Sequence, residues 1–227
     1  MNRNQDDLVS RRAVLFDLDG TFADTAPDLA AAVNRLRSEH GREPLALERL
    51  RPFASAGARG LVHAGFGIKP GEVEYPALRE AFLEHYAERT CVETRLFPGI
   101  RELLDELKRR GMAWGLVTNK ATRFTEKIIA ALALQPDCVA CGDTTPHLKP
   151  HPASLLHAAG QLHLACKDCF YLGDDLRDMK AARAAGMHPI AVGWGYHHPE
   201  SGGPDTWDAE AIIIHPRDLL PFLEPTA

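Results

Sequence analysis

The sequence of 227 residues lacks any apolar run of the roughly 18–20 residues that a membrane-spanning helix needs. Its beginning, Met1 to Arg12, is polar and charged, and it lacks the apolar stretch of a signal peptide. We interpret this segment as a short disordered leader. These absences favour a cytoplasmic protein and argue against a membrane as its partner.

Dense basic runs are also missing, and the formal net charge at pH 7 is −5. Nucleic-acid-binding domains usually gather lysine and arginine on one face, so this charge balance argues against nucleic acid as a partner. No internal repeat or low-complexity tract is present. A hydrophobic content of 45% and a charged content of 25% are ordinary for a globular protein of one large domain or two small ones.

Short apolar strands alternate with helical patterns over most of the chain. Apolar residues recur at helix spacing in the segments 100–107, 124–131, 155–159 and 176–182. The predicted strands are Ala13–Asp17, Ala113–Thr118, Cys138–Cys141, Phe170–Gly173, Ile190–Gly193 and Ala211–Ile214. This alternation predicts an α/β fold with a doubly wound parallel sheet.

The segment from about Thr25 to Arg95 breaks this alternation, because it contains helical stripes and no convincing strand. The stripes cover residues 29–36 and 78–85, and between them we expect a glycine-rich turn segment over Gly57–Gly67. We therefore predict a helical insertion over residues 25–95 and a core domain made of residues 1–24 and 96–227. Because both boundaries lie near the end of the first strand, we expect the insertion to form a lid over that end.

The first strand leads directly into Asp17-Leu18-Asp19-Gly20-Thr21. Residues i and i+2 of a strand point to the same face, so the two carboxylates start as neighbours. Gly20 allows the chain to turn sharply after them. We expect one carboxylate to act as a nucleophile and the other as a proton donor or acceptor, with a divalent cation reducing their repulsion.

Further polar residues follow the ends of other predicted strands, where open α/β sheets place their ligands. They are Thr118-Asn119-Lys120, Lys149, Gly173-Asp174-Asp175 and, one helical turn later, Asp178. A phosphate ester gives each a role, because phosphoryl transfer needs charge neutralisation on the moving oxygens. Thr118 and Lys149 can hold phosphate oxygens, and Lys149 can keep Asp17 ionised. Asp17 with Asp174 offers the oxygen ligands that Mg²⁺ prefers.

These motifs, in this order and over nearly the whole chain, resemble the four motifs of the haloacid dehalogenase superfamily, and the insertion resembles its C1-type cap. The resemblance implies a Rossmann-like core, with Asp17 as the phosphoryl-accepting nucleophile and Asp19 as the general acid/base. It implies Mg²⁺ held by Asp17, the Asp19 carbonyl and Asp174, with Asp175 and Asp178 supporting the metal through waters. Asp19 favours a phosphatase or mutase over the dehalogenase branch, since a leaving alkoxide needs a proton and a halide does not.

Local stretches narrow the resemblance to two kinds of phosphatase. Thr25–Leu29, Gly115–Lys120, Gly173–Asp178 and Gly193–Tyr196 resemble phosphoglycolate phosphatases. Gly57-Ala58-Arg59, Arg123-Phe124 and Gly195–Glu200 resemble related enzymes that act on N-acetylmuramic acid 6-phosphate in cell-wall recycling. We expect an enzyme of the phosphoglycolate phosphatase type, with N-acetylmuramic acid 6-phosphate as the alternative substrate, although the residues of the insertion alone do not rank the two firmly. For either substrate we expect a small phosphorylated metabolite as the partner. The residues expected to bind it are Thr118, Asn119, Lys120, Lys149 and Arg59. Arg59 would bind a carboxylate of the substrate through two hydrogen bonds.

Other functions stay open with less support. A sugar-phosphate mutase shares the first half-reaction and returns the phosphoryl group to a sugar. A response-regulator receiver also uses an acceptor aspartate, a threonine and a lysine, but it would be much shorter and would lack the D-x-D pattern. An inactive binding protein on the same fold would not need a complete set of motifs. The chain could be a monomer or a homodimer.

Four of the five cysteines form two C-x-x-C pairs, Cys138/Cys141 and Cys166/Cys169. Such pairs can hold zinc, and reduced thiols of a cytosolic enzyme are the alternative. The family's strand order puts the two cysteine-bearing strands on opposite sides of the first strand. Three steps of about 4.8 Å then separate them by roughly 14 Å, which is too far for one tetrahedral site. We therefore favour the thiols.

Overall fold

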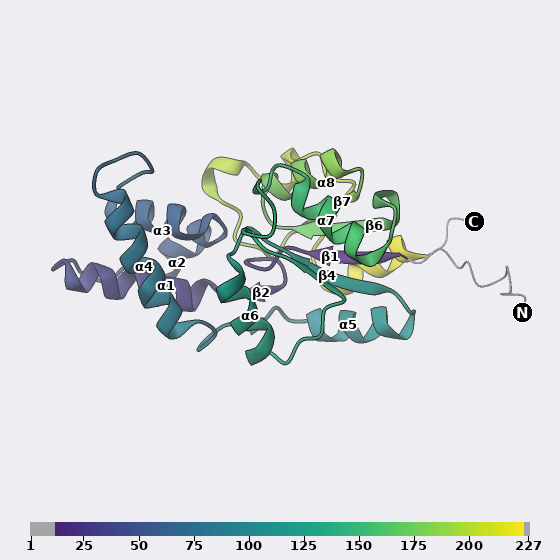
Figure 1. Cartoon of the computed structure of the whole chain (residues 1–227), viewed down its shortest axis with the longest axis horizontal. Coiled ribbons are helices and arrows are strands. Elements are labelled where there is room, and N and C mark those ends of the chain that lie inside the picture. The colour runs from purple at the N-terminus through teal and green to yellow at the C-terminus, as the bar shows by residue number, and fades with distance from the viewer. Residues whose placement is uncertain (1–11, 225–227) are drawn as a thin grey trace, which may run out of the picture.

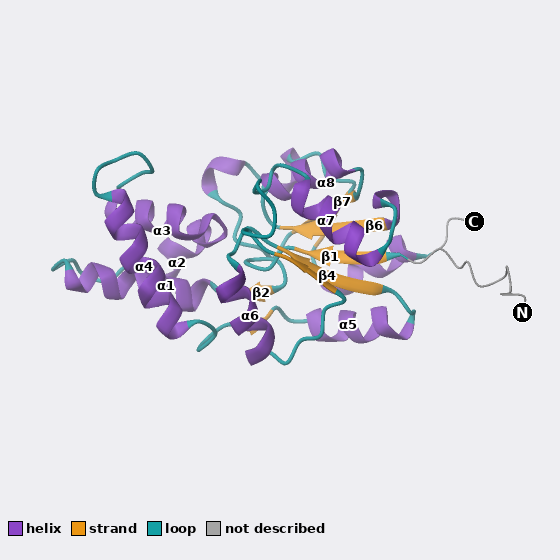
Figure 2. Ribbon diagram, in the orientation of Figure 1, coloured by secondary structure: helices purple, strands orange, loops and turns teal. Residues whose placement is uncertain are grey.

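The computed structural model describes residues 12–224 and contains a six-stranded parallel sheet between two layers of helices (Figures 1 and 2). In sheet order the strands are β5 (Cys138–Ala140), β4 (Ala113–Val117), β1 (Ala13–Phe16), β6 (Cys169–Gly173), β7 (His188–Val192) and β8 (Ala211–Ile213). This confirms the predicted doubly wound parallel sheet. The predicted leader, apart from Arg12, lies outside the described residues.

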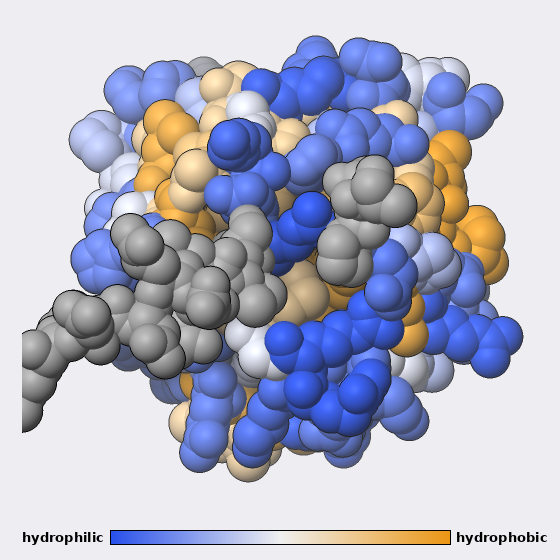
Figure 3. Space-filling model, turned by 90° about the vertical axis from the view of Figure 1, so that its right-hand side faces the viewer, coloured by the Kyte–Doolittle hydropathy of each residue, from blue (hydrophilic) through white to orange (hydrophobic). Residues whose placement is uncertain are grey.

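The central strand β1 is buried on both faces, which explains its continuous apolar sequence. Val14 and Phe16 pack against the layer of α5 (Ile100–Arg109), α6 (Thr122–Ala131) and the 3₁₀ segment η6 (Pro216–Leu223). Ala13 and Leu15 pack against α7 (Ala153–Leu162) and α8 (Leu176–Ala185). The end of the core where the described residues begin and end, at Arg12 and Glu224, carries mostly hydrophilic side chains with separate apolar patches (Figure 3).

Each of the six strands differs from its predicted bounds by one or two residues at an end, and two of these differences matter here. β1 ends at Phe16, so Asp17 lies just beyond the strand. β7 begins at His188, two residues before the predicted start, and therefore contains Pro189. A proline has no N–H to donate, and here its carbonyl accepts the N–H of Glu210 at 2.9 Å.

A second group of helices lies beyond the end of the sheet and comes from the segment between β2 (Ala23–Asp24) and β3 (Arg95–Leu96) (Figure 1). Its elements are α1 (Ala26–Glu39), α2 (Leu47–Leu50), η2 (Arg51–Ala56), α3 (Gly57–Phe66) and α4 (Tyr75–Arg89). We call this group the helical insertion. It packs around its own apolar cluster, which includes Leu29, Val33, Leu61 and Phe82. The two chain crossings pair as the short antiparallel strands β2 and β3, which the sequence analysis did not predict.

The expected glycine-rich turn over Gly57–Gly67 is wrong, because residues 57–66 form helix α3. Its glycines allow close packing rather than a loop. A Cβ on Gly60 would lie 2.5 Å from the carbonyl oxygen of Phe53, and one on Gly65 would lie 2.7 Å from Val33. Gly67, with a left-handed conformation, ends the helix.

The cysteine-bearing strands β5 and β6 are separated by β4 and β1, which is the strand order that we used to predict that the two cysteine pairs do not share a zinc ion. All five cysteines lie within the described residues, and each is a free thiol. Burial raises the pKa of the Cys138 and Cys169 thiols to about 12, so both stay protonated at neutral pH. Within residues 12–224, no helix combines the length and the apolar character needed to cross a bilayer.

Asp28 fastens α1 to the chain segment that returns to the core. Its carboxylate is fully buried and accepts hydrogen bonds from Glu93 N at 3.0 Å, Thr94 N at 2.8 Å and Thr94 Oγ1 at 2.7 Å. A buried carboxylate with three donors organises a turn that has little apolar packing of its own.

We expect Asp28→Ala to lower the free energy of unfolding by about 2 to 3 kcal/mol, because three donors lose a charged acceptor. Urea unfolding followed by circular dichroism measures this change. Asp105→Ala, on the exposed face of α5, is the control and should stay within about 0.5 kcal/mol of the parent. Equal stabilities of the two variants would show that Asp28 does not hold the crossing.

Candidate active site

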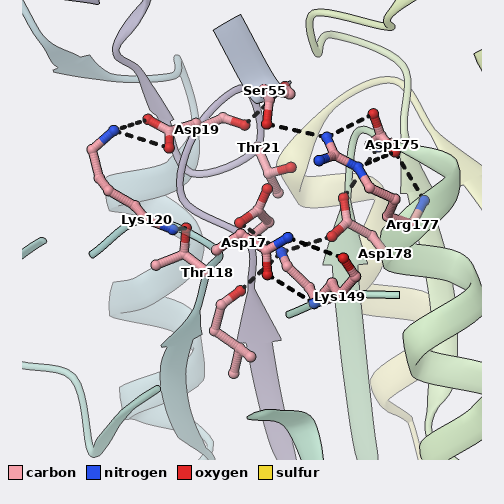
Figure 4. A network of polar contacts seen from close by, with 12 residues as sticks. Asp17, Asp19, Thr21, Ser55, Thr118, Lys120, Lys149, Asp175, Arg177 and Asp178 are labelled. Carbon is pink, nitrogen blue, oxygen red and sulfur yellow. Dashed lines mark hydrogen bonds and ion pairs between the residues drawn. The ribbon is translucent and has the colours of Figure 1, made fainter. Parts of the chain in front are cut away.

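The site lies at the carboxyl ends of β1, β4 and β6, which are neighbours in the sheet. Asp17 follows β1, Thr118 follows β4 and Asp174 follows β6, so the sheet brings together residues more than 150 positions apart. The N–H of Asp17 donates to Leu172 O at 2.9 Å, which continues the β1–β6 ladder past the strand. Figure 4 shows the resulting polar network.

Lys149 is the centre of this network and is 5% exposed. Its ammonium lies 2.8 Å from Asp17 Oδ1 and 2.7 Å from Asp178 Oδ1. It also donates to the hydroxyl of Tyr171 at 2.7 Å and to Val117 O at 3.2 Å. Burial lowers the pKa of Lys149, but the charges of the two aspartates outweigh it and hold that pKa above its ordinary value. Lys149 therefore remains a cation beside Asp17.

Three carboxylates meet next to Lys149. Asp17, Asp174 and Asp178 each offer an oxygen, and these oxygens all lie within 4.8 Å of one another. Burial, with the charges of Asp17 and Asp178, raises the pKa of Asp174 well above its ordinary value. Burial also raises the pKa of Asp178 to about 6, although Lys149 opposes that shift. Such crowding favours a bound cation.

The donor set fits Mg²⁺, which prefers carboxylate and carbonyl oxygens. Asp17 Oδ1 is buried and makes an ion pair with Lys149 but no hydrogen bond, so it keeps capacity for a ligand. Asp178 belongs to this group of three carboxylates, and its expected support of the metal through water stays a prediction. Asp175 does not belong to the group, because its carboxylate accepts from Arg177 N and Nε, both at 2.9 Å, at the start of α8.

Asp174 fits into a space that glycines leave open. A Cβ on Gly20 would lie 2.1 Å from Asp174 Oδ2, and one on Gly195 would lie 2.1 Å from Asp174 Cβ. Gly20 also has a φ of +85°, which side chains rarely adopt. The carboxylate accepts from Thr21 Oγ1 at 3.2 Å and from Tyr196 N at 2.9 Å.

The Asp19 carboxylate is paired with a different lysine. Lys120 Nζ lies 2.8 Å and 3.0 Å from its two oxygens, and Thr25 Oγ1 donates to Oδ1 at 2.5 Å. The Lys120 ammonium also lies 4.8 Å from the ring centre of Tyr86 on α4. Lys120, which the sequence analysis expected to contact substrate, therefore holds Asp19 in this arrangement.

Thr118 and Asn119 lie where the sequence analysis placed them, at the end of β4. Thr118 is buried, and its Oγ1 accepts the N–H of Lys120 at 3.1 Å. The Asn119 amide accepts from Lys149 N at 2.9 Å and donates to Lys149 O at 3.1 Å. Asn119 thus fixes the loop that carries Lys149, which is a contact that the sequence did not indicate.

A cavity of about 560 Å³ opens between the core and the helical insertion. Asp17, Asp19, Thr118 and Lys149 line its base, and Arg59, Arg79 and Arg123 line it from other sides. Its apolar wall consists of Leu29, Phe82, Leu83, Tyr86 and Phe124. Arg59 is exposed, and among the described residues it forms no ion pair with a carboxylate.

Sequence reasoning missed three side chains at this site. Tyr171 lies in an apolar strand, where a tyrosine is expected to pack in the hydrophobic core. Its hydroxyl nevertheless contacts Lys149. Ser55 has no sequence signal, because its contact depends on how the insertion packs on the core. Tyr196 was noted only within a motif, although its hydroxyl accepts from Thr25 N at 2.7 Å and Ala26 N at 2.9 Å at the start of α1.

Comparison with known proteins shows the family of this chain. A family model described as haloacid dehalogenase-like hydrolase matches residues 14–192. The chain belongs to this family. It is 42% identical over 215 residues to an N-acetylmuramic acid 6-phosphate phosphatase of Pseudomonas aeruginosa, covering 94% of this chain and 95% of that one. It is 40% identical over 218 residues to a phosphoglycolate phosphatase of Xanthomonas campestris, covering 95% and 96%.

A solved structure of a predicted phosphoglycolate phosphatase from Haemophilus somnus is also similar. Its TM-score is 0.81 at 25% identity, with 96% of this chain and all of that chain covered. The predicted superfamily, its Rossmann-like fold and an enzyme of the phosphatase type are thereby confirmed. The roles of the individual site residues stay predictions.

We expect Gly20→Ala to lower kcat/KM for phosphate esters by about 100-fold, because the new methyl group displaces Asp174. Gly41→Ala is a matched control. Gly41 also has a positive φ, of 66°, but a Cβ there meets nothing within 4 Å. Its activity should stay near that of the parent. Similar losses in both variants would mean that backbone strain, not the displacement of Asp174, limits the enzyme.

Proposed function

We propose that this chain is a Mg²⁺-dependent phosphomonoester hydrolase that works through a phosphorylated Asp17. One observation carries the proposal: Asp17 is held beside the Lys149 cation and two further carboxylates at the base of a cavity. That arrangement provides a nucleophile together with the positive charge and the oxygen ligands that a phosphate ester requires. Asp17, the Asp19 carbonyl and Asp174 would hold Mg²⁺, which supplies charge neutralisation for the phosphoryl group.

In the first step, an Asp17 carboxylate oxygen attacks phosphorus in line with the ester oxygen. A bond from Asp17 to phosphorus forms while the ester P–O bond breaks, and Asp19 donates a proton to the leaving oxygen. Lys149 and the Thr118 hydroxyl bind the other phosphate oxygens. In the second step, Asp19 accepts a proton from water, and that water oxygen attacks phosphorus and releases Asp17 and inorganic phosphate.

The cavity supports a substrate that is larger than phosphoglycolate. Its volume of about 560 Å³ lies within the range of roughly 300–1,000 Å³ that encloses drug-sized ligands, and a two-carbon ester would leave most of it empty. An apolar wall and three arginines suit a bulky organic acid. We therefore propose N-acetylmuramic acid 6-phosphate, the substrate named for the Pseudomonas relative, ahead of 2-phosphoglycolate, with Arg59 binding its carboxylate.

The helical insertion supplies one side of that cavity, which supports its role as a cap. We propose residues 25–95 as the cap domain, with residues 1–24 and 96–227 as the core domain. Its movement toward the core would exclude bulk water from Asp17 and Asp19. A cytoplasmic location and a monomeric or homodimeric state are proposed on the sequence alone.

We expect Asp17→Asn to lower phosphate release by roughly 10³-fold or more, because it removes the nucleophile. Asp19→Asn should lower kcat by about 10²- to 10⁴-fold, because it removes the proton donor. Phosphate release with Mg²⁺ and intact-protein mass spectrometry measure turnover and the phosphorylated enzyme. An active Asp17→Asn variant would refute the nucleophile. A phosphorylated enzyme that releases no phosphate from any ester would favour a mutase.

We expect Arg59→Gln to raise KM for N-acetylmuramic acid 6-phosphate by about 10-fold, because a charged hydrogen-bonded pair with the carboxylate is lost. KM for N-acetylglucosamine 6-phosphate, which lacks that carboxylate, should change little. The control is Arg49→Gln, on the exposed face of α2. An equal rise of KM for both sugar phosphates would show that Arg59 does not bind the carboxylate. Faster turnover of 2-phosphoglycolate than of either sugar would reverse the substrate order.

A further inference from the structure

A serine of the helical insertion reaches the carboxylate group of the core. Ser55 lies in η2, and its Oγ donates to Asp174 Oδ2 at 2.8 Å. The same Oγ lies 3.4 Å from the carbonyl oxygen of Asp19. Figure 4 shows Ser55 between Asp19 and Arg177. One hydroxyl from the insertion therefore contacts two oxygens of the core, one from the segment after β1 and one from the segment after β6.

The backbone of Ser55 is held at the same place. Arg177 Nη2 donates to Ser55 O at 3.1 Å, and the same guanidinium binds both oxygens of Asp175. Arg51, at the start of η2, pairs with Asp24 at 2.7 Å. These contacts hold η2 against the core, and none of them involves Asp174. Over residues 12–224, Ser55 makes the only side-chain hydrogen bond from the insertion to Asp17, Asp174 or Asp178.

We propose that Ser55 is a positioning residue for the metal, and that it couples the seating of η2 to metal binding. The two groups that it contacts, the Asp174 carboxylate and the Asp19 carbonyl, are two of the three that the proposed function assigns to Mg²⁺, so the inference rests on that function. A hydroxyl that binds a ligand carboxylate fixes its orientation, and such partners govern metal affinity. Because the contact exists only while η2 lies on the core, a metal that favours it also favours the seated insertion.

The first test is a calorimetric titration of the full chain with Mg²⁺ and no substrate. We expect Ser55→Ala to weaken Mg²⁺ binding about 10-fold. Ser55→Thr keeps the hydroxyl and should bind within about threefold of the parent. Ser38→Ala, on the exposed end of α1, is the control and should match the parent. Parent-like binding by Ser55→Ala, or no Mg²⁺ binding by the parent, overturns the proposal.

Kinetics separate positioning from a merely structural role. In Ser55→Ala the Mg²⁺ concentration for half-maximal activity should rise about 10-fold, while kcat at saturating Mg²⁺ changes less. A loss of kcat that excess Mg²⁺ does not restore, with unchanged Mg²⁺ binding, contradicts the proposal. If the parent binds Mg²⁺ but hydrolyses no phosphate ester, the proposed function fails, and the Ser55 inference is still decided by the titration.

The coupling itself is visible in hydrogen exchange. Mg²⁺ should slow amide exchange in residues 51–56 of the parent by several-fold, and this protection should be mostly absent in Ser55→Ala. The same slowing in both proteins would mean that Mg²⁺ seats η2 without Ser55, which contradicts the coupling.

Discussion

The rest of the site depends on the ion pairs and hydrogen bonds of the Lys149 ammonium. It is buried, and its partners come from the ends of β1 and β4, from the middle of β6 and from α8. A buried cation is stable only when it is paired and hydrogen-bonded, and here two carboxylates, a phenol and a carbonyl satisfy it. Those carboxylates in turn tolerate burial side by side because the cation lies between them. Removing the lysine would leave repelling charges inside the fold.

Crowding of these charges fixes residues that carry no charge. A Cβ on Gly173 would lie 2.2 Å from Asp178 Cβ, just as one on Gly20 or Gly195 would collide with Asp174. Gly20, Gly173 and Gly195 must therefore be glycine for the carboxylates to approach within 4.8 Å of one another. The Asn119 amide adds the remaining constraint, because it holds the backbone of Lys149 at both its N–H and its carbonyl. The glycines of the motifs thus serve side-chain packing as much as turning.

The sequence predicts the parts of the structure that depend on local pattern. Apolar strands alternating with helical stripes predict the sheet, and polar motifs at strand ends predict Asp17, Thr118, Lys149 and Asp174 at one edge. Features that depend on packing between distant segments are not readable in this way. Gly60 and Gly65 look like turn residues until a neighbouring helix is known, and the two-residue strands β2 and β3 are too short for any periodicity. Ser55 and Tyr171 contact the site from elements whose sequences contain no motif that indicates a functional site.

The two aspartates of the first motif also end in different surroundings, although both follow the same strand. The chain leaves the strand after Phe16, so Asp17 faces Lys149 and the carboxylate group while Asp19 faces Lys120 and Thr25. The separate partners suit the separate roles that the proposed function gives the two carboxylates, one as nucleophile and the other as proton donor and acceptor. Thr25 and Tyr86 beside Asp19, and Ser55 beside Asp174, all come from the insertion. Under the proposed function, the position of the insertion would therefore affect proton transfer and metal binding, as well as which substrate enters.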